Sequence, residues 1–204
     1  MNHRNSIRLR AATPDFNEGV VFARYADEVA EGFFRVMLGR NVVAILATAY
    51  MQPNHEHSYQ NVTFAERDGV IVGMASGYDA TQRHHFSDQP LKHAAGSHAV
   101  RMKAVKILYA PLMRILETVA EGDFYLLSLA VERALRGEGV GSMLLDAVED
   151  RARANGSARL SLDVSANKEG ARRLYGRRGM TVESQWPKRV VIPGVKLLRM
   201  TKTL

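Results

Sequence analysis

The spacing of apolar residues alternates along the chain between a two-residue period and a helical period, which predicts strands interspersed with helices. Residues 7–12 alternate apolar and charged side chains, as a half-buried strand does. Thr13-Pro-Asp15 then favours a helix start, because proline suits the first turn and a carboxylate suits its positive end. The pattern predicts one helix from there to about Leu38, and a second, almost entirely apolar helix at about 41–51.

Two further strand-like runs, 61–66 and 70–78, flank the tripeptide Arg67-Asp-Gly69. Asp-Gly between two such runs is a strong signal for an antiparallel β-hairpin. This hairpin argues against a doubly wound nucleotide-binding domain, in which a helix separates neighbouring strands.

The strand pattern gives way to helical spacing between about residues 79 and 122. Pro111 divides this stretch into two predicted helical segments. Arg101, Lys103 and Lys106 make the first segment basic and amphipathic. Such a helix can lie on a membrane, but we favour a helical insertion that packs on its own domain.

The remaining chain alternates strands and helices around a glycine-rich loop. The order of elements predicts one mixed α/β domain over residues 1–204, with the helical insertion at 79–122. The predicted elements are a buried strand at 124–131, a loop at 136–142 that runs into a helix, a strand at 158–164, a helix at 167–178, and strands at 180–184 and 195–200.

The loop Arg136-Gly-Glu-Gly-Val-Gly-Ser142 between a buried strand and a helix is typical of an anion site. Free N–H groups and the positive end of the helix converge there, and the anion is most often a phosphate. A P-loop is excluded because Gly-Lys-Ser/Thr is absent. A dinucleotide fingerprint fits poorly, because Ser142 or Leu144 stands where its third glycine would be.

Composition narrows the picture only moderately. The net charge is +7, and residues 151–204 hold 13 Lys/Arg against 3 Asp/Glu. A polyanion partner, a nucleotide cofactor and a solvated basic face all agree with this surplus. Cysteine is absent, which excludes disulfides and thiolate chemistry and favours a reducing, cytoplasmic location.

Neither a membrane segment nor a metal site is expected. No run of about 18 uncharged apolar residues occurs, and the N-terminus lacks the pattern of a secretory signal. His55 and His57 could share a metal, but no third ligand follows at a fixed spacing.

Two motifs together resemble the GNAT superfamily of N-acyltransferases. Arg136-x-x-Gly139-x-Gly141 is similar to the Arg/Gln-x-x-Gly-x-Gly/Ala loop of that family. Downstream, the run from Asn167 through Leu174-Tyr175 to Gly179-Met180 resembles its second signature, in which the last residue is usually Phe. The resemblance covers about residues 120–183 and implies a mixed central sheet flanked by helices.

The resemblance also implies acetyl-CoA as co-substrate and assigns roles to specific residues. The loop would hold the pyrophosphate, the strand edge before it would pair with the pantetheine arm, and Asn167 would contact that arm. Val131 N–H would polarise the thioester, and Tyr175 would protonate the departing thiolate, since a phenol is protonated at neutral pH. The cofactor-binding residues expected on this basis are Leu129, Ala130, Val131, Arg136, Gly137, Glu138, Gly139, Val140, Gly141, Ser142 and Asn167.

The sequence does not rank the candidates for the general base that removes a proton from the acceptor amine. Asp163, on the strand after the loop, is interpreted as structural. The candidates are Ser128, Tyr125, Glu66, Tyr59 and His57.

The resulting hypothesis is an N-acetyltransferase that acts on a small-molecule amine by direct attack in a ternary complex, without a metal or a covalent enzyme intermediate. Acetylation of a protein N-terminus or lysine, and a non-catalytic CoA-binding regulator, are alternatives. The pairs Arg172-Arg173 and Arg177-Arg178 could serve a nucleic-acid partner, but a solvated helix face is favoured. Whether the chain forms a homodimer is left open.

Overall fold

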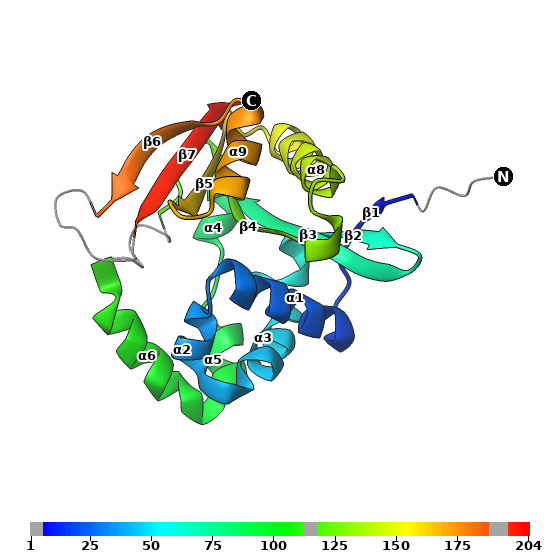
Figure 1. The fold of residues 1–204 in the computed structure, drawn as a ribbon. Helices are drawn as coiled ribbons and strands as arrows, with labels where there is room; N and C mark the ends of the chain where they lie inside the picture. The colour runs from blue at the N-terminus through cyan, green and yellow to red at the C-terminus, as the bar shows by residue number, and fades with distance from the viewer. Residues whose placement is uncertain (1–5, 112–117, 188–195) are drawn as a thin grey trace.

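The computed structural model describes residues 6–111, 118–187 and 196–204. These residues form a seven-stranded sheet with helices on both faces (Figure 1). The strands are β1 (Arg8–Ala11), β2 (Val62–Arg67), β3 (Val70–Asp79), β4 (Asp123–Val131), β5 (Arg159–Ser165), β6 (Thr181–Trp186) and β7 (Leu197–Thr203). The helices are α1 (Phe16–Val29), α2 (Phe33–Leu38), α3 (Val42–Tyr50), α4 (Ala80–His84), α5 (Gln89–Ala95), α6 (Ala99–Leu108), α8 (Val140–Ala154) and α9 (Glu169–Arg177).

The strand order is β1-β2-β3-β4-β5-β7-β6, and β4 with β5 is the one parallel pair among these strands. Their pairing is short, because it runs from Asp123↔Arg159 only to Leu126↔Leu162. Beyond it β4 pairs only with β3, and β5 pairs only with β7. The two central strands therefore part in the middle of the sheet.

A β-bulge lies where β4 leaves β5. Ser76 pairs with Ser128 and Gly77 with Leu126, so Leu127 has no partner residue in the register of β3. An added Cβ at Gly77 would lie 2.6 Å from the Phe124 ring and 2.7 Å from the Tyr125 carbonyl oxygen. Glycine is therefore required for the close approach of β3 to β4 at this kink.

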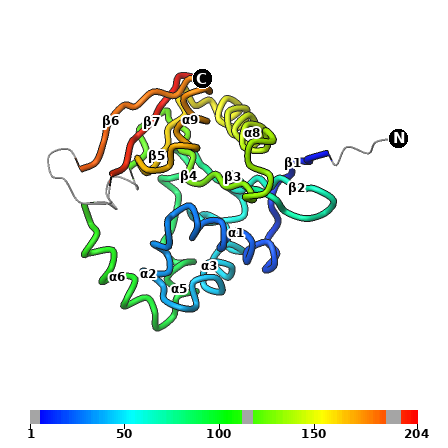
Figure 2. The backbone as a smooth tube through the Cα atoms, viewed as in Figure 1, coloured from blue at the N-terminus to red at the C-terminus, as the bar shows by residue number. Residues whose placement is uncertain are grey.

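The helices form two layers, one on each face of the sheet. The backbone tube in Figure 2 shows the same arrangement. On one face α8 packs on β2, β3 and β4, and buries Leu144 and Leu145 against the sheet. On the other face α1 and α3 pack together, with Phe22 and Tyr50 against Phe64 of β2.

The helical insertion after β3 adds to the second layer rather than to the sheet. Leu91 of α5 and Met102 of α6 pack against Met37 of α2 and Leu46 of α3. Up to Pro111 the insertion therefore packs on helices of the same chain, and the single domain over residues 1–204 stays a prediction. The second predicted segment after Pro111 lies mostly outside the described residues.

The prediction of one helix reaching Leu38 is wrong. The chain leaves helical conformation at Glu31 and Gly32, whose φ angles are 54° and 81°. Gly32 N–H closes the end of α1 on the carbonyl of Asp27 at 2.8 Å, and α2 starts at Phe33. Glycine in the left-handed region ends a helix, and the apolar periodicity continued across it without revealing the break.

The stretch Phe33–Tyr50 is long and apolar enough, by composition, to cross a membrane. In the fold it is two short helices separated by the 3-10 turn Gly39–Asn41. Leu38, Ile45 and Leu46 are buried in the core, so we interpret the stretch as interior packing.

The predicted hairpin is confirmed. Asp68 and Gly69 connect β2 to β3 with φ angles of 52° and 78°. Positive φ at both central residues is the conformation that Asp-Gly favours in two-residue hairpin turns.

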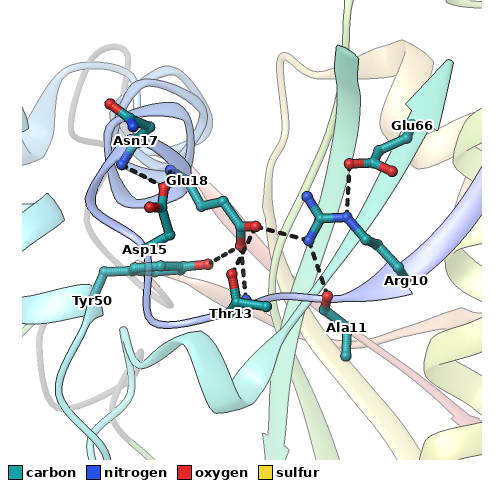
Figure 3. A network of polar contacts seen from close by, with 8 residues as sticks. All are labelled: Arg10, Ala11, Thr13, Asp15, Asn17, Glu18, Tyr50 and Glu66. Carbon is teal, nitrogen blue, oxygen red and sulfur yellow. Dashed lines mark hydrogen bonds and ion pairs between the residues drawn. The ribbon is translucent and has the colours of Figure 1, made fainter. Parts of the chain in front are cut away.

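A polar network fastens the first strand and the first helix to the rest of the fold (Figure 3). Glu18 accepts hydrogen bonds from the backbone N–H and the hydroxyl of Thr13, at 2.8 and 2.9 Å, and from the Tyr50 hydroxyl at 3.1 Å. Arg10 bridges Glu18 at 3.0 Å and Glu66 at 2.7 Å. The network connects β1, α1, α3 and β2, and it occupies the Glu66 carboxylate.

Glu18→Ala should lower the free energy of unfolding by about 1–3 kcal/mol, because it removes the shared acceptor of this partly buried network. Urea denaturation followed by circular dichroism measures the change. Glu169→Ala is the control, since its i,i+4 pair with Arg173 is exposed and should contribute less than about 0.5 kcal/mol. Equal losses in the two variants would contradict the role given to Glu18.

Candidate active site

The unpaired edge of β4 carries backbone groups that face the gap beside β5. Glu132 N–H donates to Val72 of β3 at 2.8 Å. Backbone direction alternates along a strand, so Ala130 also faces β3, whereas Leu129 and Val131 face the gap. Of the three edge residues predicted from sequence, Leu129 and Val131 thus direct their N–H groups into the gap, and Ala130 pairs within the sheet.

The glycine loop lies at the end of the same strand. Gly137 and Gly139 both have φ of 90°, and a Cβ added at either would meet no atom within 4 Å. The first intrahelical bond of α8 comes from Met143 N–H to the Gly139 carbonyl. The preceding amides of Val140, Gly141 and Ser142 therefore remain for an anion at the positive end of a 15-residue helix.

Glu138 does not join this cradle through its backbone. Its N–H donates to the Leu135 carbonyl at 3.3 Å, and its carboxylate lies 3.4 Å from Arg67. The Glu138 N–H therefore closes the turn that begins at Leu135.

Two cations tie the carboxyl ends of β4 and β5 to the end of α1. Arg136 donates to the Val131 carbonyl at 3.0 Å and pairs with Glu28 at 3.0 Å. Lys168, next to the exposed Asn167 on the loop before α9, donates to the Val29 carbonyl at 3.2 Å. Arg136, which the sequence predicts as a site residue, and Lys168, which it does not, therefore lie on the two sides of one gap.

Tyr175 lies on α9 and is buried in the core cluster that also contains Val164, Met180 and Leu198. Burial raises the pKa of Tyr175 to about 12, so the hydroxyl keeps its proton at neutral pH. Within 6–111, 118–187 and 196–204 that hydroxyl has no hydrogen-bond partner. A protonated phenol of this kind can donate to a ligand.

A cavity of about 750 Å³ opens where the central strands part. Tyr125 and Ser128 of β4 and Asp163 of β5 lie on its wall. Most of the remaining wall is apolar and comes from α1, α2, the insertion and the ends of β6 and β7. It includes Val29, Phe33, Phe34, Leu108, Tyr109 and Trp186.

Sequence reasoning missed most of this wall. From the sequence, Phe33, Phe34 and Trp186 look like ordinary core residues, because the spacing of apolar residues is the same for a cavity wall as for a packed interior.

Three of the five candidates for the proton acceptor lie on the cavity wall, and two do not. Ser128, Tyr125 and His57 lie on its wall. Glu66 belongs to the network with Arg10, and Tyr59 packs beside Tyr50, so neither reaches the cavity.

Asp163 is engaged by its neighbours. It accepts from the Tyr125 hydroxyl at 3.0 Å and pairs with Arg199, which donates to Oδ1 at 3.1 Å. Burial, and then the charge of Asp163, raise the pKa of Tyr125 well above its ordinary value. This agrees with a structural interpretation of Asp163 and makes Tyr125 a poor base.

The two histidines of the His55-Glu-His57 run have different environments. His55 Nε2 donates to the Ala49 carbonyl at 2.8 Å, and its Nδ1 accepts the His57 backbone N–H at 3.3 Å. Both nitrogens of His55 are thus used within the fold. The described part of the chain contains no group of three metal-ligating side chains.

Residues 39–180 match the sequence profile of the acetyltransferase (GNAT) family. The chain belongs to this family. The match spans more than half of the sequence and contains β4, the glycine loop, α8, β5 and α9. It confirms the resemblance found in the two motifs, and with it an acetyl-CoA-dependent acyltransferase.

Solved structures agree with the family assignment. One described as an acetyltransferase is 25% identical, with a TM-score of 0.66 over 96% of this chain and 98% of that one. An N-acetyltransferase from Staphylococcus aureus Mu50 is 16% identical, with a TM-score of 0.65 over 96% and 100%. The yncA protein from Salmonella typhimurium, with its cofactor acetyl-CoA, is 18% identical, with a TM-score of 0.54 over 97% and 94%. No curated protein sequence gives a match.

The family co-substrate fits the residues present. The open cradle at Gly137 and Gly139 suits a pyrophosphate, and the free edge at Leu129 and Val131 suits the amides of a pantetheine arm. The gap between β4 and β5 leads from this cradle toward the cavity.

Stability should decrease in mild acid because of His55. Burial, reinforced by the charge of His57, lowers the pKa of His55 to about 4, below its ordinary value near 6.5. The unfolded chain therefore takes up this proton first as the pH falls. We expect a loss of about 3 kcal/mol from His55 between pH 7 and pH 4.

Urea denaturation at several pH values measures this loss in the wild type and in His55→Gln, which should have a flatter dependence. His84→Gln is the control, because His84 is exposed and pairs only with Glu121. Parallel curves for the wild type and His55→Gln would contradict the assignment.

Proposed function

We propose that this enzyme transfers the acetyl group of acetyl-CoA to the amine of a small molecule held in the 750 Å³ cavity. The observation that carries this proposal is the position of the cavity, whose wall includes the edge where β4 leaves β5. The volume is that of a pocket for a small organic ligand.

The backbone would hold the co-substrate by two kinds of contact. The amides of Val140, Gly141 and Ser142 face the pyrophosphate, together with the open glycines of the loop, and Asn167 contacts the arm from the opposite side. Leu129 and Val131 hydrogen-bond the arm as an added strand would, and Val131 N–H stabilises charge that develops on the acyl oxygen. Bound acetyl-CoA supplies the activated acyl group.

Tyr175 would serve the leaving group. It is absent from the cavity wall, as expected of a residue that acts on the side of the thiolate rather than on the amine. Its pKa of about 12 keeps the proton available throughout the working range of the enzyme.

The acceptor would be an amine with a sizeable apolar part. Phe33 and Tyr109 pack edge to face at 5.6 Å, and both lie on the wall together with Trp186. Such a wall favours the body of an apolar molecule over a sugar or a polyamine. We propose that the chain forms one cytoplasmic domain in which the described part of the insertion, up to Pro111, borders this acceptor.

An amine panel tests the proposed acceptor class. Purified enzyme with acetyl-CoA should release CoA with arylalkylamines, and only weakly with polyamines, aminoglycosides or peptides. Thiol release measured with a chromogenic disulfide gives the rates, and mass spectrometry identifies the acetylated amine. Faster acetylation of peptides, such as the ribosomal-protein alanine that names a Brucella melitensis neighbour, would refute the small-molecule assignment.

Tyr175→Phe should lower kcat by about 100-fold while leaving the KM for the amine nearly unchanged, because the hydroxyl acts on the leaving group. Tyr59→Phe is the control, since that residue lies outside the cavity. Calorimetric titration with CoA checks that Tyr175→Phe still binds the co-substrate. Full turnover by this variant would eliminate Tyr175 as the acid.

A further inference from the structure

Helix α6 has an inner face that the fold buries. Met102 is 4% exposed and belongs to the cluster that joins α6 to α2 and α5. Ala99 and Val105 pack against the same cluster. Figure 1 shows the helix at the margin of the molecule, in the layer of helices that does not contain α8. The packing of the insertion on its own chain therefore uses this inner face.

The opposite face of α6 is apolar as well. Val100, Ile107 and Leu108 are 78%, 66% and 75% exposed, and Ala104 between them is also exposed. The spacing i, i+4, i+7 and i+8 places these four residues, the outer stripe, along one side of the helix. Single exposed aliphatic residues are common, but a continuous row on one helix face indicates a surface that binds a partner.

Basic side chains border the outer stripe on both sides. Arg101 and Lys103 are exposed, and with about 3.6 residues per turn they project to opposite flanks of the stripe. The Arg101 Nε donates to the Val36 carbonyl at 2.9 Å, and Val36 is itself 47% exposed. The outer face of α6 therefore combines aliphatic side chains in the middle with cations at both edges.

The segments around the outer stripe contain no acidic residue. Residues 32–55 and 89–111, whose helices pack together, hold six Lys/Arg and no Asp or Glu. Two carboxylates outside these segments pair with three of the six cations: Asp27 with Arg35, and Asp88 with Lys92 and Lys106. In the described ranges no carboxylate pairs with the other three, which are Arg40, Arg101 and Lys103. The outer face is thus both apolar and positively charged.

An anionic membrane surface matches this combination better than other partners do. The aliphatic residues of an interfacial helix enter the boundary between headgroups and acyl chains, while Lys and Arg contact the anionic headgroups. A nucleic acid supplies phosphates but leaves Ile107 and Leu108 in water. A two-fold dimer through this face would place Arg101 and Lys103 of one chain against the same cations of the other.

We propose that the outer face of α6 docks the protein on a membrane surface that contains anionic lipids. The outer stripe enters the interface, and Arg101 and Lys103 bind headgroup phosphates. Since α6 has only 10 residues, the docking is reversible and weakens as the ionic strength rises. It requires neither acetyl-CoA nor the acceptor proposed above.

Docking in this orientation brings one margin of the cavity to the lipid. Leu108 belongs both to the outer stripe and to the cavity wall. Tyr109, the next residue, lies on the same wall and packs edge to face on Phe33. An apolar molecule dissolved in the bilayer would therefore meet the cavity at this margin.

Vesicle sedimentation with the purified chain, in the absence of acetyl-CoA, tests the docking. Vesicles of phosphatidylglycerol and phosphatidylcholine in equal amounts should bind the protein at low ionic strength. Added salt should release it, because the headgroup charges are then screened. Vesicles of phosphatidylcholine alone should bind much more weakly. Equal binding to the two kinds of vesicle, or binding to neither, would overturn the proposal.

Two substitutions on α6 should weaken binding to the anionic vesicles. Ile107→Ser should lower the partition coefficient about tenfold, because it removes most of an aliphatic side chain from the interface. Lys103→Glu should lower it by about tenfold or more, since each cation near the surface contributes a factor of about five and the substitution reverses the charge. Circular dichroism verifies that each variant is folded.

Matched controls lie on other parts of the surface. Val70→Ser replaces an aliphatic residue that is 63% exposed at the start of β3, and Arg177→Glu reverses an exposed charge on α9. Both should bind vesicles as the wild type does. Equal losses in these controls would show that overall charge and hydrophobicity, and not α6, hold the protein on the vesicles, and would overturn the proposal.

A fluorescent label measures insertion directly and does not depend on a loss of binding. The chain contains no cysteine, so Ile107→Cys carries a single thiol for an environment-sensitive dye. Its emission should shift to the blue with anionic vesicles, whereas Val70→Cys should show no shift. An unchanged spectrum at position 107 on vesicle-bound protein would contradict the insertion of α6.

Other occupants of the outer face give different results. Sedimentation velocity without vesicles should show the same association state for the wild type and Ile107→Ser. A dimer that this substitution dissociates would assign the face to a second copy of the chain. Binding of RNA that Lys103→Glu abolishes, without binding to vesicles, would assign it to a nucleic acid. Either result overturns the proposal.

Discussion

The site depends on the short parallel pairing between β4 and β5. Four residue pairs, from Asp123↔Arg159 to Leu126↔Leu162, join the strands, and then each strand keeps only its outer neighbour. Backbone groups left unpaired inside a protein carry a large cost unless something satisfies them. The free edge of β4 is therefore both a gap in the sheet and a strong reason to bind a strand-like ligand.

Several features of the fold maintain this gap. The bulge at Leu127 bends β4 at the point of departure, and Gly77 lets β3 follow it without a clash. Arg136 and Lys168 then bind the end of α1 across the opening. The opening has the glycine loop at one end and the cavity at the other.

Local pattern predicted most of the elements, and the resemblance of the loop and the Asn167–Met180 run together to one family predicted the co-substrate. Asp68-Gly69 predicted the hairpin, which the structure confirms, and the role of the loop from Gly137 to Ser142 in binding stays a prediction. The break at Gly32 was missed because apolar periodicity reports burial and not backbone continuity. The cavity could not be predicted from the sequence, since Phe33, Trp186 and His57 come together on its wall only through tertiary packing, and their spacing along the chain does not indicate it.

The clamp between α1 and the two loops has a thermodynamic consequence. Arg136 pairs with Glu28, and Lys168 donates to the Val29 carbonyl. These two residues of α1 directly precede the turn that leads to Phe33 on the cavity wall. A ligand that shifts the glycine loop would therefore also shift a contact that supports the cavity wall. Since coupling free energies are reciprocal, any factor by which the co-substrate changes the affinity for the acceptor is the factor by which the acceptor changes the affinity for the co-substrate.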